Sequence, residues 1–426
     1  MTRFILVLTC VASFGAVDPS SATAQDVDCQ RLRESVGGSV RENPREVCRL
    51  LSTLAHDSME GRSAGSRGAH RAARFIADQF RAAGLQPAGD SGYFQRVPLV
   101  LVQRPNGRTS FQLAPSFAAR DTVAESRRGI DVNVIGRLTG SDPILKDSVV
   151  LVDAHFDHVG LARSPLDVDS IHAWQMLAAP IRAERDAWFK SSGIAARAER
   201  GNPQLTADEQ AKMAAFTSRI AALKVNMDSI RRVHPAARLD SVFNGADDDA
   251  SGVIAVIEIA RRIAAGPRPK RTIIFAATTG EEVGLLGTRW YIEHPVVPNA
   301  ALQANLEIEM IGRPDSLAGG KGRGWLTGFE RSTMGEMFAA NGLPIVPDRR
   351  PEQSFFARSD NIAFARMGIP AHTLSSFNMH TDYHQLSDDV RAVDFEHMAT
   401  VIDAAVKAVE LLANGTAPSW KPGGKP

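Results

Sequence analysis

Residues 149–152 of the chain read Val-Val-Leu-Val, and residues 272–276 read Thr-Ile-Ile-Phe-Ala, so each run is apolar at almost every position. A strand with one solvated face alternates apolar and polar residues, whereas uninterrupted apolar runs are typical of strands that are covered on both faces. Helical patterns lie between several of these runs and further strand-like segments at 97–102, 132–138, 304–308 and 370–374. We therefore expect an α/β fold with a mixed, largely parallel central sheet flanked by helices.

The organisation of the chain follows from where this alternation is interrupted. Residues 164–241 are rich in Ala and Arg; within them Thr206 and Glu209 form a capping box, and apolar spacings of three and four predict one long helix over 206–232. We expect this helical insertion either to pack on itself or on the core, or to serve as a lid or a dimer contact. The expected divisions are a signal peptide (1–24), the two parts of the α/β domain (25–163 and 242–414), the insertion (164–241) and a flexible tail (415–426).

The charge balance excludes one class of partner. The chain has 49 Lys and Arg residues against 48 Asp and Glu residues, a formal net charge of +1. A nucleic-acid-binding surface needs an excess of positive charge, so we expect no nucleic-acid partner. The apolar segments are shorter than the ~20 residues that a membrane span requires, so we expect no span either.

The first 24 residues have the pattern of an export signal. Arg3 supplies positive charge, residues 4–17 are mostly apolar, and residues 22–24 form a small-residue cleavage site. We therefore expect the mature chain to be exported, to the periplasm or the medium. It would retain Cys29 and Cys48, which could pair in an oxidising compartment or remain free thiols.

Candidate functional residues lie close behind predicted strands or just before a predicted helix, where the loops of an open α/β sheet converge on one crevice. They comprise two imidazoles and several carboxylates: His155, the run Asp247 to Asp249, Glu281, Glu282, Glu309 and His384. This is the ligand mix expected for two zinc-like ions that share one bridging carboxylate. Of two adjacent carboxylates such as Glu281 and Glu282, one can bind a cation while the other remains free for proton transfer.

Three other sequence features can be interpreted either as functional or as purely structural. The run Asp247 to Asp249 could be a solvated turn that caps the following helix, but its position between apolar elements favours bound cations. His158, close to His155, is a lone His at a strand end, and such residues are more often structural. Residues 61–65 match the G-x-S-x-G string of serine hydrolases, but a helical pattern precedes them where that motif requires a strand.

Five strings follow one another along the chain: His155-Phe156-Asp157-His158, residues 245–252, residues 280–284, residues 309–313, and Tyr383-His384 with Asp388. In these strings and in their order, the chain resembles the M28-type co-catalytic zinc aminopeptidases and carboxypeptidases. The resemblance extends from about Leu51 to Leu412, apart from the insertion, and includes the stretch from Arg358 to Ala371.

The resemblance implies a role for each candidate residue. Asp248 would bridge two Zn²⁺ ions, or other divalent ions such as Co²⁺ or Mn²⁺; His384 and Glu282 would complete one site, and His155 and Glu309 the other. Glu281 would be the general base, Asp157 would orient His155, and Tyr383 would donate to the tetrahedral oxyanion. The chain departs from many members of the family at Glu309, where they have Asp.

These roles describe a hydrolase that acts on peptides with a metal-activated water. We expect an exported di-zinc aminopeptidase. A carboxypeptidase or a glutaminyl-cyclase-like enzyme on the same scaffold is the enzymatic alternative, because metal ligands do not encode which end of a substrate is held. A receptor-like binding module that has lost catalysis is the alternative from another class. The sequence leaves the oligomeric state open.

Overall fold

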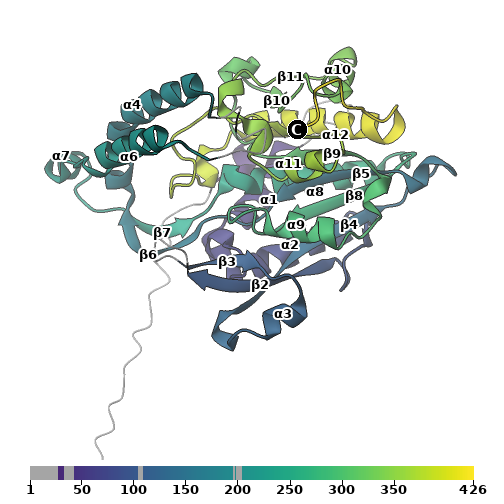
Figure 1. The fold of residues 1–426 in the computed structure, drawn as a ribbon, viewed down its shortest axis with the longest axis horizontal. Coiled ribbons are helices and arrows are strands. Elements are labelled where there is room, and N and C mark those ends of the chain that lie inside the picture. Colours follow the sequence, from purple (N-terminus) through teal and green to yellow (C-terminus); the bar gives the residue numbers. More distant parts are fainter. Residues whose placement is uncertain (1–26, 33–42, 104–108, 195–196, 198–203) are drawn as a thin grey trace, which may run out of the picture.

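The computed structural model describes residues 27–32, 43–103, 109–194, 197 and 204–426 (Figure 1). The expected signal peptide therefore lies outside the described residues. In the described part of the chain, no helix combines the length and the apolar character that crossing a bilayer requires.

The strands of the structure include all of those predicted from the apolar runs. They are β1 Gln86–Pro87, β2 Phe94–Gln103, β3 Thr109–Leu113, β4 Arg128–Leu138, β5 Val149–His155, β6 Gly160–Asp167, β7 Leu239–Phe243, β8 Thr272–Thr278, β9 Leu302–Ile308, β10 Gly324–Leu326, β11 Ile345–Pro347 and β12 Ala371–Ser375. β6 and β7 form a two-stranded sheet of their own, and the others form the central sheet. The short strands β1, β3, β10 and β11 were not predicted.

The central sheet is mixed, and its middle is parallel, as predicted. The strand order is β11-β10-β12-β9-β5-β8-β4-β2-β3, with β1 paired to β4. β12, β9, β5 and β8 run parallel to one another, whereas β4 and β2 are antiparallel to their neighbours. Every residue of β5 and β8 is buried, which explains their uninterrupted apolar sequences. The carboxyl ends of four parallel strands therefore meet at one edge of the sheet.

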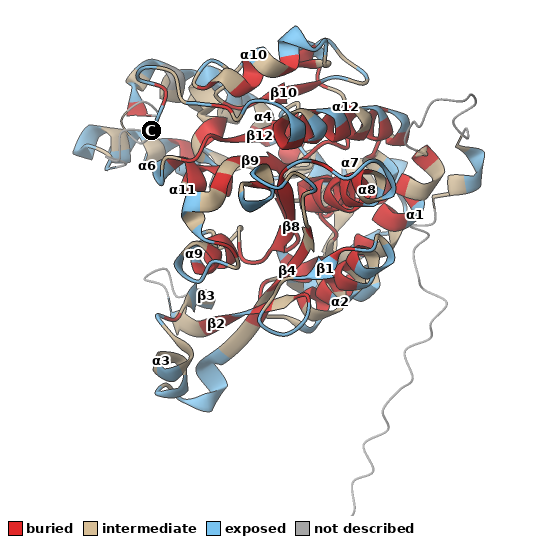
Figure 2. Ribbon diagram, turned by 90° about the vertical axis from the view of Figure 1, so that its right-hand side faces the viewer, coloured by how far each residue is buried: buried red, intermediate tan, exposed pale blue. Residues whose placement is uncertain are grey.

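Helices cover both faces of this sheet (Figure 2). The helices are α1 Pro44–Leu54, α2 Arg67–Ala82, α3 Phe117–Asp121, α4 Val168–Ser192, α6 Ala207–Ala221, α7 Met227–Val233, α8 Gly252–Ala265, α9 Leu286–Glu293, α10 Thr333–Ala340, α11 Asn361–Arg366 and α12 Phe395–Asn414. The larger apolar core joins one face to α1, α2, α8 and α12, and a second core joins the other face to α9 and α11. The predicted α/β architecture with helices on both faces is confirmed.

The insertion projects from one side of this sandwich, on the β6–β7 pair (Figure 1). The prediction of one long helix over 206–232 was wrong, because the chain forms two helices, α6 and α7, with residues 222–226 between them. The predicted capping box of Thr206 and Glu209 is present at the start of α6. The side chain of Asn226 accepts a hydrogen bond from the amide of Ser229 and begins α7 as a new helix.

The C-terminal segment, expected to be a flexible tail, packs on the domain instead. Trp420 forms a β-bridge with Ser332, and its indole N–H donates to the carbonyl of Gly368 over 2.9 Å. Lys421 pairs with Glu336 over 2.6 Å. The segment is therefore held against the domain by the ring of Trp420 and by several polar contacts, which include backbone hydrogen bonds of Ser419 and Lys421.

A disulfide joins Cys29 to Cys48 and decides between the two alternatives left open by the sequence. It ties the N-terminal segment to α1, in which Cys48 is fully buried. Bridging residues 19 apart in sequence lowers the entropy of the unfolded chain.

The double variant Cys29→Ser/Cys48→Ser should lose about 3 kcal/mol of unfolding free energy, because its unfolded chain is no longer cross-linked. Urea denaturation of the oxidised protein and of the variant measures this difference. Reductant should lower the stability of the natural chain and leave that of the variant unchanged. Equal stability of oxidised protein and variant would show that the bridge contributes nothing.

Candidate metal centre

The candidate ligands converge at the edge where the parallel strands end. His155 is the last residue of β5, Glu282 lies four residues beyond β8, and Glu309 directly follows β9. His384 lies in the loop after β12, and Asp248 lies just before α8. Residues from five separate parts of the chain thus meet at one place, as the sequence predicted.

The carboxylate of Asp248 lies between two groups of ligands. Its Oδ1 is 3.4 Å from Nε2 of His155, whereas its Oδ2 is 3.0 Å from Nε2 of His384. There are two sets of ligand atoms, and within each set the atoms lie within 4.8 Å of one another. Asp248 belongs to both: His155, Asp248 and Glu309 form one, and His158, Asp248, Glu282 and His384 form the other. The five predicted metal ligands are therefore close enough to hold ions on either side of Asp248.

His158 belongs to the second set, although the sequence favoured a structural role for it. Its Nδ1 lies 2.9 Å from Oε1 of Glu282 and 3.8 Å from Oδ2 of Asp248, and its side chain is fully buried. The only sequence signal was its position three residues after His155, and local spacing does not reveal a partner 124 residues away. The structure thus offers a fourth protein ligand on the His384 side.

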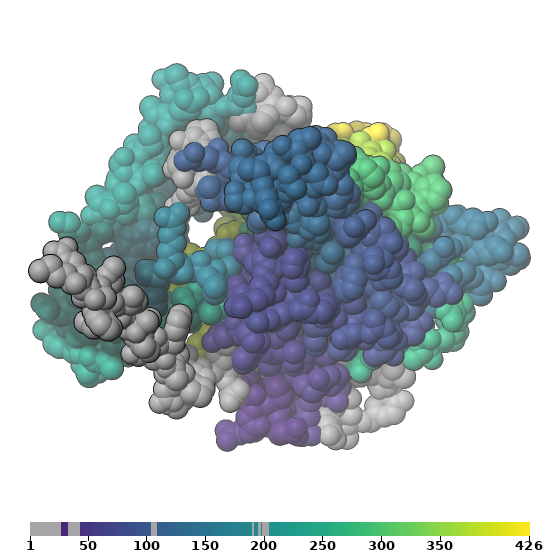
Figure 3. All heavy atoms as spheres, turned by 90° about the horizontal axis from the view of Figure 1, so that it is seen from below, coloured from purple at the N-terminus to yellow at the C-terminus, as the bar shows by residue number. Residues whose placement is uncertain are grey.

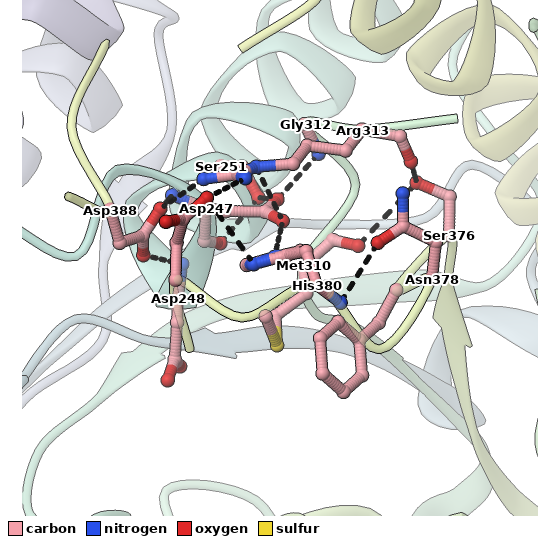
Figure 4. A network of polar contacts seen from close by, with 12 residues as sticks. Asp247, Asp248, Ser251, Met310, Gly312, Arg313, Ser376, Asn378, His380 and Asp388 are labelled. Carbon is pink, nitrogen blue, oxygen red and sulfur yellow. Dashed lines mark hydrogen bonds and ion pairs between the residues drawn. The ribbon is translucent and has the colours of Figure 1, made fainter. Parts of the chain in front are cut away.

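Of the three consecutive aspartates, only Asp248 belongs to the ligand sets. In Figure 4 its carboxylate points away from the polar network around Asp247. Asp247 accepts a hydrogen bond from the amide of Gly312 over 2.7 Å and lies 3.0 Å from Nε2 of His380. Asp249 accepts from the amide of Met310 over 3.0 Å. All three side chains are buried, which excludes the solvated-turn interpretation.

Asp388, which belongs to the last of the five strings, holds this loop in place. Its carboxylate accepts from the backbone amides of Asp247, over 3.0 Å, and Asp248, over 3.1 Å. Arg313 lies 3.3 Å from the same carboxylate and provides compensating charge (Figure 4). Asp388 therefore positions the backbone that carries Asp248.

Arg62 is a buried positioning residue that the sequence did not reveal. Its guanidinium donates to the carbonyl of Phe156 over 2.7 Å, and it also bonds the carbonyls of Leu54, Asn244 and Gly245. Burial lowers the pKa of Arg62 to about 10, which leaves it protonated at neutral pH. The guanidinium of Arg62 thus joins the loop after β5 to the loop before α8. The G-x-S-x-G string to which it belongs begins in the last two residues of a 3₁₀ helix, Asp57–Arg62, and does not follow a strand.

Replacing Arg62 by Met should lower the free energy of unfolding by at least about 3 kcal/mol, because four buried carbonyls lose their donor. Zinc affinity should fall as well, since the loops that carry His155 and Asp248 lose their common anchor. Urea denaturation and metal titration measure the two effects. Arg67→Met is the matched control, because the Arg67 side chain is 73% exposed. Equal losses in both variants would contradict the anchoring role.

The electrostatics of the site favour bound cations. Burial raises the pKa of Glu309 to about 8, with the charge of Glu307 adding to the effect. Burial also raises the pKa of Glu281 well above its usual range. Buried carboxylates of this kind are stabilised in their charged form by neighbouring cations.

Unpaired atoms in the site fit metal ions. Among the described residues, buried atoms of both ligand sets lie close together but lack a hydrogen bond of suitable geometry; they include Nε2 of His155, Oδ2 of Asp248 and Nε2 of His384. Imidazole nitrogens and carboxylate oxygens are ligands of Zn²⁺. The donor set therefore suits zinc on chemical grounds.

Glu281 lies beside the ligand sets without belonging to either. Its Oε2 is 3.9 Å from Nε2 of His155, and its backbone amide donates to Oδ1 of Asp157 over 3.0 Å. The Asp157 carboxylate therefore holds the turn that carries Glu281. The nearest acceptor for Nδ1 of His155 is the carbonyl oxygen of Asp157 at 3.2 Å, with its carboxylate at 3.7 Å. Asp157 thus contacts His155 as expected, but chiefly through its backbone.

Tyr383 lies at the border of the site. Its ring stacks on the imidazole of His384 with 3.9 Å between centroids, and it contacts Phe377 on another side. Tyr383 also lines a small cavity together with Glu309 and Arg358. As an oxyanion donor, Tyr383 would need its hydroxyl near the reacting carbonyl of the substrate. This role of Tyr383 stays a prediction.

Two solved structures with the same fold are aminopeptidases by name, and one of them is named a zinc aminopeptidase. The aminopeptidase from Aneurinibacillus sp. strain AM-1 has a TM-score of 0.51 at 12% identity, with 90% of this chain and 97% of that chain covered. A zinc aminopeptidase from Bacillus subtilis has a TM-score of 0.52 at 13% identity, covering 89% of this chain and 97% of that one. At this identity the likeness shows the fold.

Sequence comparison adds the family. Residues 220–409 match the family model described as peptidase family M28. Leupeptin-inactivating enzyme 1 of Streptomyces exfoliatus is 30% identical over 148 residues, which are 33% of this chain and 31% of that protein. A vacuolar membrane protease of Candida albicans is 26% identical over 189 residues, or 41% of this chain and 22% of that protein. The matched part is thus less than a third of either relative.

Fold and site together define the class: an α/β protein with the zinc aminopeptidase fold and a cluster of His, Asp and Glu ligands at the carboxyl edge of its sheet. Residues 220–409 match peptidase family M28, and the fold of the whole chain is that of zinc aminopeptidases. The resemblance inferred from the five strings is confirmed.

Proposed function

We propose that this chain is an exported di-zinc metallopeptidase that releases N-terminal residues from peptides. One observation carries the di-zinc part: the two oxygens of Asp248 face two different ligand sets, Oδ1 toward His155 and Oδ2 toward His384. A single-ion site would need only one of these sets. The match of residues 220–409 to a peptidase family and the fold shared with aminopeptidases support the reaction class.

Two zinc ions held by these residues would polarise the peptide carbonyl and generate a nucleophile from water at neutral pH. Glu281 accepts the proton of the attacking water and delivers it to the leaving amine nitrogen. This role requires a carboxylate near the ligands that does not itself bind an ion, and Glu281 meets it at 3.9 Å from His155. Tyr383 donates a hydrogen bond to the developing oxyanion.

Export is supported by two features of the chain. The first 24 residues have the pattern of a signal peptide, with Arg3 ahead of an apolar stretch. The disulfide between Cys29 and Cys48 is of a kind that persists in oxidising compartments. Both features fit a periplasmic or secreted protein.

A substrate panel together with metal analysis tests the proposal. The purified protein is assayed with aminoacyl anilides, N-blocked dipeptides and peptides with N-terminal Gln, and its zinc content is measured on the same sample. We expect about two zinc ions per chain and cleavage of the anilides alone. Cleavage of blocked dipeptides would indicate a carboxypeptidase, and cyclisation of N-terminal Gln a cyclase. An empty site with no turnover would favour a binding module.

A further inference from the structure

A cavity of about 560 Å³ lies between α4 of the insertion and the loop that carries His384. This volume is within the usual range for ligand pockets. The insertion contributes Arg182, Arg185 and Asp186, and the catalytic domain contributes Arg358, Tyr383 and His384. The cavity therefore opens directly onto the candidate metal centre, and one wall of it belongs to the insertion. Figure 3 shows from below how the insertion stands apart from the body of the molecule, with an opening between them.

The cavity carries an excess of positive charge. Arg185 is paired with Asp186 over 2.8 Å. Arg182 and Arg358 make no ion pair and no side-chain hydrogen bond with any other described residue, and Asp186 is the one carboxylate among the described residues that line the cavity. The guanidinium groups of Arg182 and Arg358 thus line the cavity without a carboxylate to balance their charge.

Aromatic rings hold both guanidinium groups from one side. Arg182 lies over the ring of Trp174 at 5.4 Å from its centroid, and Arg358 lies over the ring of Phe355 at 5.1 Å. A guanidinium has five N–H donors, so a cation–π contact with one ring leaves donors available for another group. These donors match the geometry of a carboxylate, which can accept two of them at once.

We infer that Arg182 and Arg358 form a subsite for a carboxylate of the substrate, so that the enzyme prefers short peptides that carry a negative charge beyond the bond to be cleaved. The inference rests on the proposed function, because the cavity becomes a substrate subsite only if peptides are cleaved at the metal centre. The carboxylate has two possible sources: the C-terminal carboxylate of a short peptide, or an acidic side chain.

Three peptides distinguish these sources: Leu-Gly-Gly, its C-terminal amide, and the amide of Leu-Glu-Gly. The first has only a C-terminal carboxylate, the second has none, and the third has only a side-chain carboxylate. We expect the charged peptides to have a KM at least about tenfold below that of Leu-Gly-Gly amide, since a charge-assisted pair is lost on amidation. The peptide with the lower KM identifies the source.

The variant Arg182→Gln/Arg358→Gln should remove this difference. Its KM for the preferred charged peptide should rise about tenfold or more, with kcat and the KM for the neutral amide within twofold of the natural enzyme. Arg219→Ala is the matched control, because this arginine lies on the same insertion, pairs with Glu184 and does not line the cavity. Thermal melting of all variants verifies that they are folded.

Binding gives a second readout that is independent of turnover. Calorimetric Kd values for the same three peptides, measured with Glu281→Gln in the presence of zinc, should follow the same order. If the natural enzyme cleaves charged and neutral peptides with equal KM, the inference is wrong and the proposed function stands. If it cleaves none of them, the proposed function itself fails. An equal rise of KM for all three peptides in the double variant would also overturn the inference.

Discussion

Replacing Glu281 by Gln should lower kcat by about 10²- to 10⁴-fold and leave the zinc content unchanged. Gln has nearly the same shape but cannot accept the proton of the attacking water. The side chain of Glu281 is in neither ligand set, so its replacement removes no ligand. Its backbone amide, which donates to Asp157 over 3.0 Å, is retained in the variant. Steady-state kinetics on an aminoacyl anilide and metal analysis of the same sample measure both quantities.

The neighbouring variant Glu282→Gln is the sharpest comparison for this experiment. Glu282 lies 3.0 Å from Nε2 of His384 and belongs to a ligand set, so its replacement should lower zinc content as well as activity. The two adjacent carboxylates should thus separate into a proton acceptor and a ligand. Full activity of Glu281→Gln with its metals bound would falsify the assigned mechanism.

The variant Asp248→Asn should weaken both zinc sites at once. The two carboxylate oxygens face different ligand sets, and an amide offers only one oxygen and no negative charge. Zinc at 1,000 times its Kd stabilises a protein by about 4 kcal/mol for each site, so the natural chain should melt at a clearly higher temperature after zinc is added back to the chelated protein. In the variant most of this rise should disappear.

Melting curves with and without added zinc, together with zinc analysis, test this expectation. Asp78→Asn is a suitable control, because the side chain of Asp78 is 64% exposed and lies on α2, away from both ligand sets. The control should behave like the natural chain. If Asp248→Asn still bound two ions with the natural zinc-dependent rise, Asp248 would not be the shared ligand.

The sequence predicts the central strands well because strands that are buried on both faces consist almost entirely of apolar residues. The segments 149–152 and 272–276 are apolar because β5 and β8 are buried along their whole length. The strands β10 and β11, at one end of the sheet, have only three residues each, and strands that short carry no recognisable pattern. The prediction of a single helix over 206–232 was wrong because the apolar spacing continues across the break between α6 and α7. Spacing alone therefore did not reveal that Asn226 begins a separate helix.

The candidate ligands were predictable because acidic and imidazole side chains at strand ends are chemically distinctive. The residues that position them are not. Arg62 makes contacts with residues 94 to 183 positions further along the chain, and the string around it pointed to another kind of enzyme. His158 meets Glu282 across 124 positions, so its neighbours in sequence could not reveal its partner. Such contacts depend on tertiary packing, which local patterns do not encode.

The pairing of β6 with β7 has a consequence for how this molecule can diversify. Gly160 lies opposite Phe243, so the chain leaves the catalytic domain and returns to it at adjacent points. A segment whose two ends are neighbours can be lengthened, shortened or exchanged at small entropic cost, because the strands beside it need not move. The insertion is thus a replaceable module, and natural selection can vary it while the hydrolytic machinery stays constant.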